Sequence, residues 1–107
     1  MPQPLAPIAI LALLSGLVPA SAQVAGDATL GQALARDHCA RCHDVEPGGA
    51  FKQSPPSFAA IAVYFTPDMI QSRILFPNHM SMPQLMNIMD PGAAKDILAY
   101  IVSLEPK

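Results

Sequence analysis

The stretch Cys39-Ala40-Arg41-Cys42-His43 decides how the rest of this chain is interpreted. Two cysteines separated by two residues and followed directly by a histidine form the spacing typical of c-type haem attachment. On one helical turn, each thiol can form a thioether with one vinyl group of the porphyrin, and the adjacent imidazole can ligate the iron. These are the two cysteines of the whole sequence, so this use leaves none for a disulfide.

Two other uses of the motif compete with haem attachment. A Cys-x-x-Cys pair can be a redox disulfide, but that use is associated with alternating strands and helices, and no such pattern surrounds Cys39 and Cys42. The pair can also be half of a zinc site, but the sequence lacks a second pair, and His38 and His43 are too close along the same turn to complete a tetrahedral set. Haem attachment is therefore favoured.

Residues 1–22 are predicted to be a secretory signal peptide. An apolar run over residues 6–18 precedes Ala20-Ser21-Ala22, which has the form of a cleavage site. The run is shorter than the about 20 residues of a membrane helix, so no stable membrane span is expected in the mature protein. Residues 1–7 contain no Lys or Arg, which is unusual for a leader, and a retained N-terminal anchor is the alternative.

Residues 23–107 are expected to form one small domain. A chain of this size buries a limited share of its surface and usually needs a further stabilising element; a covalently held macrocycle would supply it. The formal net charge is −2, and the six Lys and Arg are scattered along the sequence. This distribution argues against nucleic acid as a partner.

Helix signals recur along the domain, and no strand pattern alternates with them, so an all-α fold is predicted. Thr66-Pro67 and Asp90-Pro91 each combine a capping residue with a proline in the first turn. The expected helices begin at Asp27 or Thr29, at Ser57, at Thr66 and at Asp90, and the last three end by Tyr64, Pro77 and Glu105-Pro106.

Two helix faces are expected to pack. Gly31 and Ala35 share a face with the two cysteines, and their small size lets another helix approach closely. The last helix has an amphipathic stripe, made of Ala93, Ile97, Tyr100, Ile101 and Leu104.

Met69, in the third expected helix, is predicted to lie in the core, whereas His38 is predicted to be solvated.

Residues 78–89 are unusually rich in methionine and also contain His79. Thioether sulfur and imidazole nitrogen are both ligands of haem iron, so this segment is the place to look for a second axial ligand. Met86 and Met89 are expected to fill the core instead.

From residue 23 to residue 107, the chain resembles the class I c-type cytochromes, small bacterial monohaem proteins. The shared order is a helix ending in Cys-x-x-Cys-His, a proline-bearing loop, a middle helix, a Met-Pro segment and a terminal helix. The resemblance implies three to five short helices wrapped around one covalently attached haem c. Gly31, Ile97 and Tyr100 match packing positions of the family, but Ala35 stands where an aromatic residue is common.

The resemblance also implies a set of site residues. His43 would be the proximal iron ligand, and the carbonyl of Pro56 would accept a hydrogen bond from its other ring nitrogen. Met82, which is followed by Pro83, would be the distal ligand. Met80, His79 and an open iron position are the alternatives for the distal side, and the prolines could merely stiffen their loop.

The implied function is one-electron transfer by a periplasmic monohaem cytochrome with His/Met ligation, and the chain would not itself be an enzyme. Donor and acceptor would be periplasmic redox proteins, or the chain could be the permanent haem subunit of an oxidoreductase. Arg41, Lys52 and Arg73 are the basic candidates for the docking surface, so docking is expected to be mostly apolar. The alternative is a gas-sensing haem protein with a labile or absent distal ligand.

Overall fold

A computed structural model describes residues 1–3, 25–78, 82 and 90–107. Within these residues, secondary structure consists of helices and one isolated bridge between Gln53 and Pro56. The helices are α1 (Ala28–His38), α2 (Phe58–Tyr64), α3 (Pro67–Leu75) and α4 (Pro91–Ser103). The predicted all-α class is confirmed. The predicted signal peptide lies almost wholly outside the described residues, and the described part contains no helix long and apolar enough to cross a membrane.

Side-chain caps explain where the helices begin. The carboxylate of Asp27 accepts hydrogen bonds from the backbone N–H groups of Thr29 and Leu30, at 2.9 and 3.1 Å, so Asp27 rather than Thr29 caps α1. Thr66 and Asp90 cap α3 and α4, and each is followed by a proline, as predicted. These bonds satisfy N–H groups that the first turn of a helix leaves without partners.

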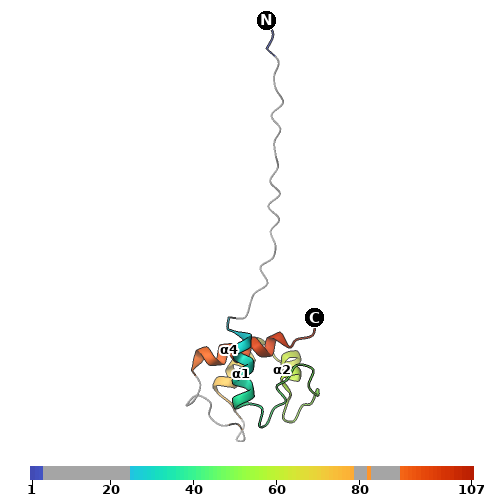
Figure 1. The fold of residues 1–107 in the computed structure, drawn as a ribbon, viewed down its shortest axis with the longest axis vertical. Coiled ribbons are helices and arrows are strands. Elements are labelled where there is room, and N and C mark those ends of the chain that lie inside the picture. The colour runs from blue at the N-terminus through green and yellow to red at the C-terminus, as the bar shows by residue number, and fades with distance from the viewer. Residues whose placement is uncertain (4–24, 79–81, 83–89) are drawn as a thin grey trace.

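Helix α4 is the common packing partner, because it contacts α1, α2 and α3. Figure 1 shows α1 crossing α4. The crossing is close at Gly31, where an added Cβ would collide with the backbone carbonyl of Asp96 and lie 2.9 Å from the Cβ of Tyr100. The predicted packing role of Gly31 is therefore confirmed.

The hydrophobic core lies between α4 and the other three helices. Its buried members are Ala35, Val45, Phe58, Ala62, Ile70, Ile74, Ala94, Ile97, Leu98, Tyr100 and Ile101. The prediction that Met69 belongs to the core is wrong, because its side chain is 43% exposed. Ile70 and Ile74 define the buried face of α3, and a residue next to Ile70 in sequence is turned about 100° away from it.

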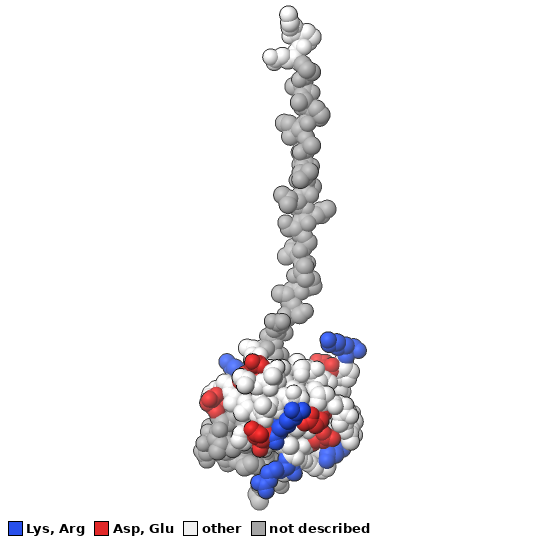
Figure 2. Space-filling view, viewed as in Figure 1, with Lys and Arg blue, Asp and Glu red and all other residues white. Residues whose placement is uncertain are grey.

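Charges of both signs are interspersed on the face of the molecule shown in Figure 2. No patch of a single sign covers the described part of that face. His38, at the end of α1, is exposed as predicted.

Candidate haem site

A cavity of about 250 Å³, partly open to solvent, lies between α4, α3, α2 and the end of α1. Its wall is mostly apolar, and it is lined by Cys39, His43, Pro56, Phe58, Ile61, Phe65, Ile70, Arg73, Ile74, Pro77, Asn78, Met82, Ile97 and Ile101. The cavity therefore joins residues from both sequence segments that were predicted to hold a haem.

The ring of His43 is held by the loop that precedes α2. Its Nδ1 atom lies 2.6 Å from the carbonyl oxygen of Pro56. A carbonyl oxygen can only accept a hydrogen bond, so Nδ1 carries a proton, and in the neutral ring Nε2 then keeps its lone pair. This is the tautomer that a histidine needs in order to ligate a metal through Nε2.

The two cysteines occupy different environments. Cys39 ends α1, is partly buried and lines the cavity, whereas Cys42 is exposed and is not part of the lining. The backbone N–H groups of Cys42 and His43 both donate to the carbonyl of Cys39, at 3.2 and 2.9 Å. This turn holds the three residues of the motif close together.

The environment of the motif does not favour the competing interpretations. Burial raises the pKa of the Cys39 thiol to about 11, whereas the reactive thiol of a redox Cys-x-x-Cys pair has a lowered pKa. Among the residues that the structure describes, no group of three or more His, Cys, Asp or Glu side chains could hold a metal ion. The zinc interpretation therefore finds no ligand set in that part of the chain.

Met82 lines the same cavity as His43 and packs against the hydrophobic core. The alternative ligands Met80 and His79 lie outside the described residues. A thioether sulfur and a neutral imidazole, brought to one apolar cavity beside a cysteine, form a donor set suited to haem iron. The residues present therefore fit a covalently attached haem.

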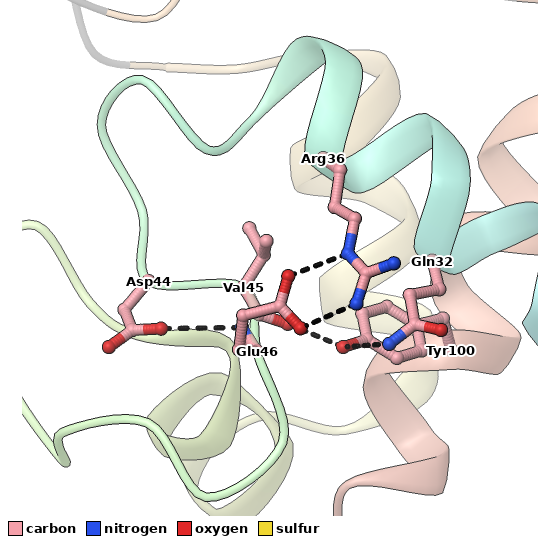
Figure 3. Close-up of polar contacts among 6 residues, drawn as sticks. All are labelled: Gln32, Arg36, Asp44, Val45, Glu46 and Tyr100. Atoms are coloured by element: carbon pink, nitrogen blue, oxygen red, sulfur yellow. Dashed lines mark hydrogen bonds and ion pairs between the residues drawn. The ribbon is translucent and has the colours of Figure 1, made fainter.

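Figure 3 shows a polar cluster that the sequence does not predict. The hydroxyl of Tyr100 donates to the carbonyl of Val45 at 2.5 Å, and the Gln32 amide lies 3.4 Å from that hydroxyl. Nearby, Arg36 forms a two-pronged ion pair with Glu46, at 2.6 and 2.8 Å. The sequence offers no signal for these pairs, because the partners are distant along the chain or belong to an irregular loop.

A second polar feature lies on the cavity wall itself. The guanidinium of Arg73, in α3, donates a hydrogen bond to the side-chain oxygen of Asn78. Both residues line the cavity. Arg73 was expected on the docking surface, and its side chain is exposed.

The all-helical fold and the apolar cavity fit a haem protein, and comparison with known proteins agrees. A family model described as cytochrome c matches residues 28–105. The chain is 34% identical over 83 residues to cytochrome c2 of Pararhodospirillum photometricum, covering 78% of this chain and 67% of the relative. It is 38% identical over 90 residues to cytochrome c-552 of Bradyrhizobium diazoefficiens, covering 80% and 83%. No solved structure matches the chain at a significant level.

The chain belongs to the cytochrome c family. As a member of this family it contains one covalently attached haem c, and its two cysteines agree with that cofactor. It is a monohaem electron-transfer protein rather than an enzyme.

Proposed function

We propose that this chain is a periplasmic one-electron carrier whose haem is attached through Cys39 and Cys42 and ligated by His43 and Met82. The observation that carries the proposal is that His43 and Met82 line one apolar cavity. The hydrogen bond from His43 to Pro56 supports it, because it leaves Nε2 free to ligate a metal.

Each residue has a separate task in this proposal. When bound, the haem supplies the iron that takes up and releases one electron. His43 offers Nε2, and the carbonyl of Pro56 fixes the ring and increases its basicity. Met82 offers a thioether, which favours the reduced state more than a second imidazole would. With His43 and Met82 both holding the iron, no ligand position would be left for a substrate, as a carrier requires.

Residues 1–22 would serve as the leader that exports the chain, and residues 23–107 would be the mature cytochrome domain. The apolar run and the cleavage-site pattern support this assignment. The test is the N-terminal sequence of protein recovered from a periplasmic fraction. A mature chain that begins at Gln23 supports the assignment, and a chain that retains residue 1 contradicts it.

Its redox partners would be periplasmic proteins that dock largely through apolar contacts. Large hydrophobic side chains are exposed on α2, α3 and the neighbouring loops, including Phe51, Tyr64, Met69 and Phe76, and the rings of Phe51 and Tyr64 lie 5.7 Å apart. Exposed apolar side chains of this kind also favour the variant in which the chain is the haem subunit of an oxidoreductase. Co-purification with a larger redox chain would support that variant, and a free monomer in the periplasm would contradict it.

Salt dependence tests the docking mode. We expect the rate of electron exchange with the partner to change little with ionic strength, because the large exposed side chains of the proposed surface are apolar. A steep fall of the rate as salt is added would contradict apolar docking.

The function itself is tested on protein matured in a host with haem-attachment machinery. We expect the haem to remain with the chain after acid denaturation, and to be lost from the Cys39→Ser/Cys42→Ser double variant. A potentiometric titration should follow a one-electron curve. Rapid carbon monoxide binding to the reduced protein at neutral pH would instead support the gas-sensing alternative, because it requires an accessible iron position.

A further inference from the structure

The polar side chain of Ser57 is buried, with only 1% of its surface exposed. Its hydroxyl oxygen accepts hydrogen bonds from the backbone N–H groups of Ala60, at 3.2 Å, and Lys52, at 3.4 Å. The first bond caps α2, and the second ties the start of α2 to the preceding loop. Neither bond belongs to the proposed redox site itself.

The peptide group between Pro56 and Ser57 is hydrogen-bonded through both its carbonyl and its N–H. Its carbonyl oxygen accepts from His43 Nδ1 at 2.6 Å, and its N–H donates to the carbonyl of Lys52 at 2.9 Å. Because a peptide group is planar, the direction of its N–H fixes the direction of its carbonyl. Lys52 therefore determines where the Pro56 carbonyl points.

The backbone position of Lys52 is itself held by Ser57. Lys52 is bonded to Ser57 twice, through its carbonyl to the Ser57 N–H and through its own N–H to the Ser57 hydroxyl. On the far side, the N–H of Phe58 donates to the carbonyl of Asp44, the residue after His43, at 2.8 Å. The hydroxyl of Ser57 therefore contributes one of the hydrogen bonds that orient the Pro56 carbonyl toward the His43 ring.

We propose that Ser57 is a positioning residue for the proximal ligand, and that its hydroxyl helps to set the reduction potential through the bond between Pro56 and His43. This inference rests on the proposed function, because it requires His43 to be an iron ligand. Alanine at position 57 cannot accept a hydrogen bond, so the N–H groups of Lys52 and Ala60 both lose a partner, that of Ala60 at a buried position. The loop that carries Lys52 and Pro56 then relaxes, and the hydrogen bond from His43 Nδ1 to the Pro56 carbonyl weakens.

A weaker bond at Nδ1 makes the imidazole a poorer electron donor. The oxidised iron loses more stabilisation than the reduced iron, so the reduction potential rises. The Nδ1 proton is also less protected, so it exchanges faster with solvent. A residue that serves only as a helix cap would produce neither effect.

The test compares Ser57→Ala with Thr66→Ala in the haem-loaded protein. Thr66 is a matched control, because its hydroxyl caps α3 by accepting from the N–H of Met69 and has no bond to the loop that carries Pro56. For Ser57→Ala we expect exchange of the His43 Nδ1 proton, followed by NMR in the reduced protein, to be about fivefold faster. We also expect the equilibrium constant for reduction to change by about twofold or more in favour of the reduced state.

For Thr66→Ala, where one exposed capping bond is lost, we expect a smaller loss of stability with neither change. If Ser57→Ala behaves like Thr66→Ala, Ser57 is only a cap and the inference is overturned. If the unsubstituted protein itself shows no signals of a histidine-ligated haem, the proposed function fails, independently of Ser57. The two failures are therefore distinguishable.

Discussion

The hydroxyl of Tyr100 donates a hydrogen bond to the backbone carbonyl of Val45 at 2.5 Å and so joins two residues that are 55 positions apart. Tyr100 belongs to α4, and Val45 lies two residues after His43 (Figure 3). Burial raises the pKa of the tyrosine hydroxyl, which keeps it protonated and able to donate. The last helix thereby anchors the loop that begins at the proposed proximal ligand.

Replacing Tyr100 with Phe should remove this anchor and leave the buried Val45 carbonyl without its partner. We expect the free energy of unfolding to fall by about 1–2 kcal/mol, measured by urea denaturation of the holoprotein. Tyr64→Phe is the control, because Tyr64 is 59% exposed, and it should be nearly neutral. Equal effects of the two substitutions would show that the bond to Val45 contributes nothing.

Gly31→Ala should force α1 and α4 apart, because the new Cβ would collide with the backbone of Asp96. We expect a loss of about 3 kcal/mol in the free energy of unfolding. Gly92→Ala is the matched control in the first turn of α4, where a Cβ would lie 3.0 Å from a carboxylate oxygen of Asp90. A shift of a few tenths of an ångström by that side chain, which also accepts the capping bond from the N–H of Ala93, would relieve the contact, so a change below about 1 kcal/mol is expected. A tolerated Gly31→Ala would disprove the close helix crossing.

The ion pair between Arg36 and Glu46 should make stability depend on pH in acid. The hydrogen bond from Arg36 holds the pKa of Glu46 below its ordinary value of 4.5. A lowered pKa in the folded state means that the stabilisation is present above that ordinary value. It is lost as the pH falls through the lowered pKa.

The free energies of unfolding of the native protein and of Glu46→Gln should therefore differ near neutral pH and converge in strong acid. The difference should be small and should shrink in high salt, because both side chains are about half exposed. Arg36→Gln should reproduce the behaviour of Glu46→Gln. A difference that stays constant across the whole pH range would exclude the ion pair as its source.

Much of the fold was predictable because its signals are local. Thr66-Pro67 and Asp90-Pro91 mark helix starts through bonds that span a few residues, and the structure has both caps. The small size of Gly31 predicted a close helix contact, although the sequence alone could not show that Asp96 faces it. The family resemblance, which the comparisons confirm, supplied the remaining order of the elements.

Other features depend on tertiary structure and could not be predicted. The bond between Tyr100 and Val45 depends on how α4 meets a loop. The sequence places Ser57 at the start of an expected helix, but only the packing around it shows that its side chain is buried. Met69 was misplaced because helix α3 buries a narrow face, which the sequence of a short helix does not define well.

The central claim is that His43 and Met82 are the axial ligands, and visible and near-infrared absorption of the oxidised protein tests it most directly. Iron–thioether ligation is expected to give a weak band at about 695 nm. The account predicts this band in the unsubstituted protein and in Met80→Leu, and its loss in Met82→Leu. A band that survives in Met82→Leu but disappears in Met80→Leu, or a low-spin spectrum with no such band in the unsubstituted protein, would contradict the account.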